Sequence, residues 1–379
     1  MSPARLIGIL IAFVLCVGGV VGYVWAESYL GGLIRAEIDR TGQPYSLQYT
    51  GYDFTLWNQS VRLEQVNMAA PGVATGRADS IQSYGLKWQT EPSFRITGVR
   101  SAEIVNGFAD YPNRARPSQI TANRVVIKSP TMTDELMQVT PNMPAHESAI
   151  LVARAIDGME AERVTISEVK SGIPNPVIGI ARISSSRPPN ATTLLPSQYL
   201  VIEDVNILDQ SRVKPEVMQL MMPNRIEFSV LWQAGKVSTT SVDIDVAEVK
   251  ARSSSTIEYA TYFDPGQGKS SQAAQSALND ATFKQADVSL VLGQGELSDQ
   301  IRQKLPLLGL LIGGQMRQQS DPTLRAAMKD ITQGLAKVQN GSSDRVDIRI
   351  ANKGSASIGD FKKMPERQLF QQVDVKVSN

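Results

Sequence analysis

The sequence predicts a mainly β protein, an antiparallel sheet with a helical insertion, behind one N-terminal transmembrane helix. Three observations predict this class. Residues 6–25 form a charge-free apolar stretch, and about 20 such residues cross a bilayer core of about 30 Å. Most of the remaining chain alternates apolar and polar residues between turn residues, which is typical of antiparallel strands with one solvated face. A block at about residues 270–339 has a helical apolar period instead.

Composition narrows the chemistry that the protein can perform. The 379 residues include 38 basic and 37 acidic side chains, which give a net charge of +1. We therefore expect no nucleic-acid partner. The chain has one cysteine, Cys16, inside the apolar stretch, and one histidine, His146. Internal disulfides and Cys/His metal clusters are excluded. We predict no metal, no cofactor and no enzymatic activity. His146, next to a predicted helix start, fits a surface histidine better than a catalytic base.

The N-terminal stretch has two interpretations, an uncleaved anchor or a signal peptide. Val24, Trp25 and Ala26 could form a cleavage site, but the apolar region is longer than the about 7–15 residues of a signal peptide. Arg5 precedes the stretch and Glu27 follows it, so the N-terminus should be cytoplasmic and the body exported. We predict a cytoplasmic tail at residues 1–5 and an anchor at residues 6–26. The expected membrane-facing residues include Leu6, Ile11, Phe13, Val20 and Trp25.

A short amphipathic helix should follow the anchor. Leu30, Ile34 and Ile38 recur at helical spacing, and Gly42 and Pro44 end the pattern. We predict a neck at residues 27–44. It leads from the membrane to the body or packs on the first sheet, and the two roles are compatible.

The body, residues 45–379, contains most of the predicted elements. We predict no domain boundary at the proline- and serine-rich residues 184–190, only a loop. Helices are predicted at residues 147–156, 213–222, 270–280, 297–318 and 321–339. The expected strands are residues 45–49, 52–56, 61–63, 84–88, 94–96, 120–122, 125–127, 164–166, 177–183, 199–208, 225–232, 236–250, 256–263, 286–292, 344–351 and 370–377.

Two polar motifs suggest sites but have simpler explanations. Residues 264–270 resemble the end of a phosphate loop, yet Phe263 occupies the position that requires the first glycine. A glycine-rich turn explains them better. Asp243 and Asp245 share a strand face opposite Ile244, which is typical of a solvated face rather than an acid pair. Glu248 does not complete a calcium loop, because the oxygen spacing is wrong.

Residues 305–316 form the second most apolar run. About 12 residues are too few to cross a bilayer, so a buried core helix is the default. The alternative is a helix that lines or plugs an apolar groove or lies on a membrane surface. The candidate groove or lid residues are Leu305, Leu307, Leu308, Leu310, Leu311 and Ile312.

Residues 45–57, 60–66, 69–71 and 78–86 together resemble the opening of AsmA-like and YdgA-like bacterial envelope proteins. The likeness covers about the first 130 residues and consists of apolar alternation. It implies a single inner-membrane anchor and an elongated, curved sheet in the periplasm. It also implies an apolar inner face and a role in lipid transport or envelope assembly.

The physical chemistry of the sheet agrees with that expectation. A sheet that is solvated on one face must cover the other with helices, a second sheet or a ligand, and incomplete cover leaves a groove for acyl chains. We expect a membrane-anchored periplasmic protein that handles lipid or supports envelope assembly. The alternative is a scaffold or interaction module that docks a membrane or secretion partner. A serine or carboxylate hydrolase has no support in the sequence.

Overall fold

The computed structural model describes residues 3–70, 74–111, 118–129, 156–187, 198–212, 222–233, 236–260, 271–318, 322–364, 368 and 372–378, with the backbone only for residues 3–22. His146 and residues 264–270 lie outside these ranges. The predicted helices at residues 147–156 and 213–222 fall almost entirely outside them.

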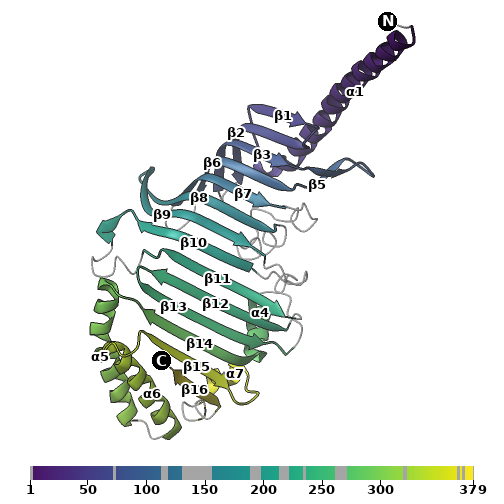
Figure 1. Ribbon diagram of the computed structural model, residues 1–379. Helices are drawn as coiled ribbons and strands as arrows, with labels where there is room; N and C mark the ends of the chain where they lie inside the picture. Colours follow the sequence, from purple (N-terminus) through teal and green to yellow (C-terminus); the bar gives the residue numbers. More distant parts are fainter. Residues whose placement is uncertain are drawn as a thin grey trace. The chain divides into compact units, whose positions relative to one another are not determined.

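The described chain is mainly β and its paired strands are antiparallel, which confirms that part of the predicted fold class (Figure 1). The large sheet has 14 strands in the order β1-β2-β3-β6-β7-β8-β9-β10-β11-β12-β13-β14-β15-β16, and β4 and β5 form a separate pair. The strands are β1 Gly51–Thr55, β2 Ser60–Ala70, β3 Ala74–Tyr84, β4 Lys87–Gln89, β5 Arg95–Gly98, β6 Ser101–Tyr111, β7 Ser118–Lys128, β8 Gly158–Lys170, β9 Ile173–Ser186, β10 Gln198–Ile207, β11 Arg225–Gln233, β12 Val237–Val246, β13 Val249–Glu258, β14 Thr282–Leu292, β15 Arg345–Asn352 and β16 Val373–Ser378.

Helices begin the chain and interrupt the sheet late in the sequence. The helices are α1 Pro3–Gly42, α4 Ser271–Asp280, α5 Glu296–Gln318, α6 Pro322–Gln339 and α7 Ile358–Lys363, with short 3-10 turns η1 Gln43–Tyr45 and η3 Gln210–Arg212. The predicted helical insertion is confirmed: α4, α5 and α6 match the expected helices within a residue or two, and β14 runs between the first two.

The chain forms two compact units. Unit 1 comprises Met1–Pro144, Ala155–Ala161 and Ile166–Pro174, and unit 2 comprises Ala145–Arg154, Glu162–Thr165 and Asn175–Asn379. Each unit has its own apolar core.

Helix α1 packs on the first strands of unit 1 through its C-terminal half. Ile34 is fully buried in the core beside Phe54 and Val61. The Tyr52 hydroxyl donates a hydrogen bond of 2.7 Å to the Gly31 carbonyl oxygen, and burial raises the pKa of Tyr52 above its usual range. The expectation that the neck segment packs on the first sheet is confirmed. It is the end of one continuous helix rather than a separate one.

Within the part of the chain whose side chains are described, no helix is both long and apolar enough to cross a membrane. The predicted anchor at residues 6–26 lies mostly outside that part, because residues 3–22 are described by their backbone alone. The anchor therefore stays a prediction. Trp25, at its end, is 67% exposed and its ring stacks on Tyr29 with the centroids 5.5 Å apart.

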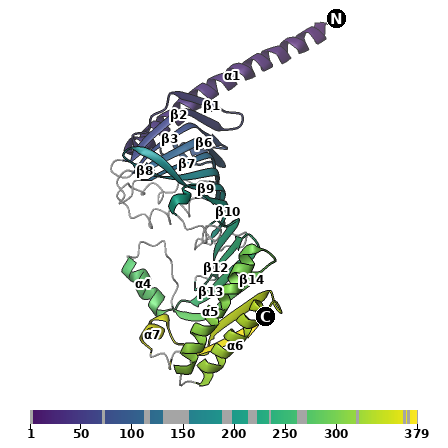
Figure 2. The same cartoon turned by 90° about the vertical axis from the view of Figure 1, so that its left-hand side faces the viewer.

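The core of unit 2 lies where α5 and α6 meet the last strands. Leu292, Leu305 and Val338 are buried together there, and α6 contacts β15 and β16. Figure 2 shows the two helices beside each other.

Two strand predictions in unit 2 are wrong. Residues 236–250 form a hairpin rather than one strand, because Ala247 takes a left-handed backbone (φ 48°) and Val246 pairs with Val249 across the turn. Of the strand predicted at residues 256–263, residues 256–258 are the end of β13, which already begins at Val249, and residues 261–263 lie outside the described ranges.

Candidate functional site

Strands of unit 1 contain residues with a left-handed backbone in mid-strand. Gln65 in β2 has φ 51° and Asn106 in β6 has φ 50°. Side chains normally alternate between faces along a strand. Around Gln65 the alternation slips by one residue: Leu63 and Val66 are both buried, whereas Glu64 and Gln65 between them are exposed. Like a β-bulge, such a residue redirects the side chains that follow it.

Gln65 of β2 and Asn106 of β6 lie at the same level of the sheet, one strand apart. Glu64 pairs with Ser80 of β3, and Ser80 pairs with Val105 of β6, one residue before Asn106. Val105 pairs in turn with Arg124 of β7. A transverse line through these paired residues crosses β2, β3, β6 and β7, which lie side by side in Figure 1. We call it the kink line.

An apolar cavity of about 250 Å³ lies along the kink line, and we call it the kink pocket. Its lining combines larger aliphatic side chains with glycines and alanines, whose missing side-chain volume leaves the hollow. Its lining residues are Val66, Met68, Gly76, Arg77, Ala78, Ile81, Ile104, Gly107, Phe108, Ala109, Ile120, Ala122 and Val125.

The lining of the kink pocket is almost wholly apolar. Among its described lining residues, Arg77 alone is charged, and its guanidinium carbon lies 5.3 Å from the centroid of the Phe108 ring. This cation–π contact lies on the opposite face of the strands from Gly76 and Ala78, because side chains alternate between faces along a strand. The pocket itself offers apolar contact area to a hydrocarbon chain.

Gly76 shows that the pocket has usable room. A Cβ added there would meet the Met68 side chain at 3.6 Å, an ordinary contact distance. Met68 is itself 42% exposed, so the cavity is reached past a flexible thioether side chain.

The predicted groove or lid residues lie in α5 of unit 2, and none of them lines the kink pocket. Leu305 is buried and Ile312 is half-buried. The prediction that residues 305–316 form a buried core helix is wrong for the other four leucines, which are exposed to solvent. Leu307, Leu308, Leu310 and Leu311 are 61%, 49%, 73% and 67% exposed. No observation tests the groove or lid role, which stays a prediction.

Unit 2 has a second hollow of about 320 Å³, lined mainly by charged side chains of both signs. Asp243 and Asp245 line it, on the strand face opposite Ile244. Arg252 donates to Asp243 at 2.8 Å, and salt bridges between exposed partners contribute about 0–1 kcal/mol each. Both aspartates are half-buried, and Asp243 is ion-paired with Arg252, so the predicted solvated face is not confirmed.

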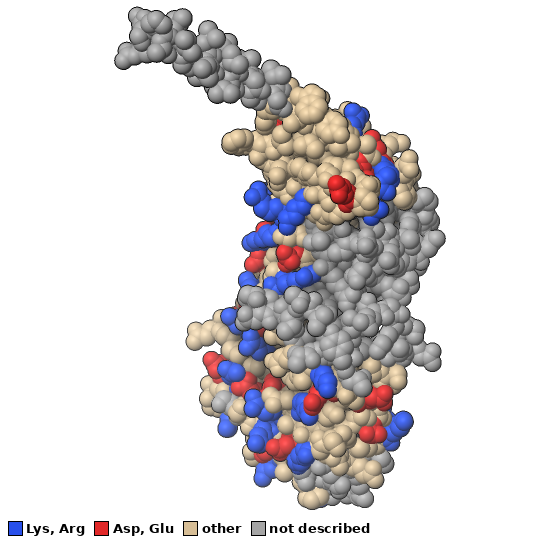
Figure 3. All heavy atoms as spheres, turned by 90° about the vertical axis from the view of Figure 1, so that its right-hand side faces the viewer, with Lys and Arg blue, Asp and Glu red and all other residues tan. Residues whose placement is uncertain are grey.

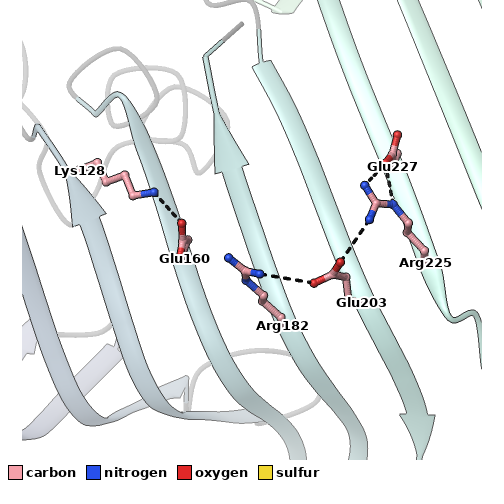
Figure 4. A network of polar contacts seen from close by, with 6 residues as sticks. All are labelled: Lys128, Glu160, Arg182, Glu203, Arg225 and Glu227. Carbon is pink, nitrogen blue, oxygen red and sulfur yellow. Dashed lines mark hydrogen bonds and ion pairs between the residues drawn. The ribbon is translucent and has the colours of Figure 1, made fainter.

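Cross-strand ion pairs continue on neighbouring strands (Figure 4). In unit 2, Glu203 lies between Arg225 at 3.2 Å and Arg182 at 3.9 Å. In unit 1, Lys128 meets Glu160 at 2.6 Å. On the face drawn in Figure 3, the described basic and acidic side chains are likewise mixed rather than segregated. These pairs explain strand register better than they explain ligand binding.

Glu248 has a structural role. Its carboxylate accepts a 2.8 Å hydrogen bond from the backbone N–H of Ser298, in the first turn of α5. That bond lowers the pKa of Glu248 below its usual value. Among the described residues, no three His, Cys, Asp or Glu side chains gather into a possible metal site.

Sequence reasoning missed the kink pocket, although a signal for the slip was present. The segment 63–67 has the pattern apolar-Glu-X-Val-Asn, in which apolar residues are three apart instead of two. Similar segments occur at residues 161–165 and 202–206. There Arg163 and Asp204 also have a left-handed backbone, with φ 51° and 52°.

The sequence matches no protein-family model and has no significant similarity to a characterised protein. Fold and pocket together define an antiparallel β protein with an apolar cavity on a kinked part of its sheet.

Proposed function

We propose that the protein is a membrane-anchored, non-catalytic lipid-binding protein of the bacterial periplasm, and that the kink pocket holds part of an acyl chain. The observation that carries the proposal is the pocket's lining, which is apolar apart from Arg77. Small-molecule sites are concave and mostly apolar with a few polar groups that fix orientation.

The pocket's size limits the ligand. Pockets for drug-sized ligands measure about 300–1,000 Å³, and the kink pocket, at about 250 Å³, is slightly smaller. It fits a segment of hydrocarbon chain better than a whole phospholipid.

The proposed location rests on the N-terminal sequence. Residues 6–26 have the length and apolarity of a transmembrane span, and Arg5 before them favours a cytoplasmic N-terminus. The resemblance of the first 130 or so residues to AsmA-like and YdgA-like proteins supports an inner-membrane anchor, an elongated, curved sheet and a role in lipid transport or envelope assembly.

A titration with a fluorescent fatty acid tests the proposal. Gly76→Leu places a side chain in the kink pocket without a close contact at its Cβ, so it should weaken binding about tenfold or more, a loss of about 1.4 kcal/mol. Thr75→Leu is the matched control, because it adds the same side chain at the adjacent exposed position of β3. It should bind like the parent protein.

Unchanged binding by the Gly76→Leu protein, or equal weakening by both substitutions, would contradict the proposal. Circular dichroism of both proteins should show the parent β signal.

A further inference from the structure

We propose that the hairpin of α5 and α6 docks on an anionic lipid bilayer through the four exposed leucines of α5, Leu307, Leu308, Leu310 and Leu311. We call them the leucine face. The inference concerns unit 2 and does not depend on ligand binding by the kink pocket in unit 1.

The leucine face is one side of α5, and the other side of α5 packs against the core of unit 2 and against α6. Leu305 is buried in the core of unit 2, and a Cβ on Gly309 would meet Thr332 of α6 at 3.9 Å. The exposed leucines occupy positions i, i+1, i+3 and i+4, which share a single helical face. Contiguous exposed apolar residues of this kind mark a membrane or protein interaction site.

The net charge of the α5–α6 segment favours an anionic partner. The segment Glu296–Gln339 carries six basic and four acidic side chains, so its net charge is +2 (6 − 4). Two of the acidic residues, Glu296 and Asp299, lie in the first turn of α5, more than a turn before the leucines. Lys304 on α5 and Lys329 on α6 are exposed. Lys304 lies one turn before Leu307 and Leu308 on the same side of α5, and exposed cations beside an apolar helix face are typical of helices that lie in an anionic membrane interface.

The same charges disfavour pairing with a second copy of this chain. A two-fold interface brings identical patches together, so Lys304, which lies one turn before Leu307 and Leu308 on α5, would approach its own counterpart. Anionic headgroups instead complement this charge while the leucines enter the acyl boundary.

A site-specific fluorophore tests this docking in the full-length protein kept soluble by an amphipathic polymer. Cys16→Ser removes the native thiol, and Leu310→Cys provides a labelling site in the leucine face. Ala336→Cys is the matched control, because Ala336 is an exposed residue of α6 outside that face. Each labelled protein is mixed with phosphatidylcholine vesicles, with or without phosphatidylglycerol, and the emission maximum is recorded.

The proposal predicts a blue shift for the label at position 310 with anionic vesicles only. The shift should shrink at about 0.5 M salt and in a Lys304→Glu, Lys329→Glu protein. Gly76→Leu should leave it unchanged, which separates this result from the kink-pocket titration.

Three outcomes would overturn the proposal. They are no shift at position 310, the same shift at position 336, and an equal shift with vesicles that lack phosphatidylglycerol. A blue shift without vesicles that grows with protein concentration would assign the leucine face to a contact between two copies, and would also overturn it.

Discussion

Among the described strand residues, Gln65, Asn106, Arg163 and Asp204 hold a left-handed backbone. For residues with a side chain this conformation costs about 1–2 kcal/mol, and all four side chains are exposed. In unit 1 the slip at Gln65 places Val66 and Met68 in the lining of the kink pocket. Strained backbone that persists at a pocket is consistent with a role in shaping it.

Replacing Gln65 with glycine should stabilise unit 1. Glycine removes the left-handed cost of about 1–2 kcal/mol but adds an entropic cost of about 0.5–1 kcal/mol. Gln65→Gly should therefore raise the free energy of unfolding by about 0.5–1 kcal/mol, measured by denaturant titration. Thr75→Gly, in an extended and exposed part of β3, should lower it by about 0.5–1 kcal/mol. If Gln65→Gly destabilises as much as Thr75→Gly, the left-handed assignment at position 65 is wrong.

At the scale of the elements, regular periodicity predicted more than irregular backbone did. Helix α6 was predictable because Pro322 begins it and an apolar period runs to Gln339. The hairpin at Ala247 was not, because Val246 and Val249 continue an apolar pattern without a glycine or proline between them. The apolar residues 305–316 predicted a helix. They did not predict which leucines are buried, because that depends on where α6 packs against the helix.

Helix α5 should depend on Glu248 in a pH-dependent way. The folded state lowers the pKa of Glu248 below its usual 4.5. Its ionised form therefore contributes stability above that usual value, and the contribution is lost as the pH falls through the lowered pKa. Glu248→Gln should increase hydrogen exchange in the first turn of α5 at about pH 7.

The difference between the Glu248→Gln and parent proteins should shrink as the pH falls through the lowered pKa of Glu248, because the parent side chain then becomes neutral as well. A difference that stays constant across this range would show that the charge of Glu248 does not hold the helix start.

At the scale of the whole molecule, the sequence predicted a mainly β protein but not its pocket. The kink pocket depends on the register of β2, β3, β6 and β7, and register is a tertiary property that one sequence does not show. β6 was not predicted at all, because Asn106 and Gly107 interrupt its alternation. The irregular backbone at Asn106 that prevented the prediction of β6 lies between two residues that line the pocket, Ile104 and Gly107.

The location of the protein can be tested at its N-terminus. An uncleaved anchor predicts that the protein leaves the membrane fraction only with detergent, and that N-terminal sequencing recovers residues 6–25. A mature chain beginning at Glu27 in a soluble periplasmic extract would show that the segment is a cleaved signal peptide.

The most direct test of lipid binding is native mass spectrometry of the purified full-length protein, with identification of any bound lipid. The account predicts an acyl-chain lipid that copurifies with the parent and Thr75→Leu proteins and is strongly reduced in the Gly76→Leu protein. A parent protein without bound lipid, or one whose lipid is retained fully by Gly76→Leu, would contradict it.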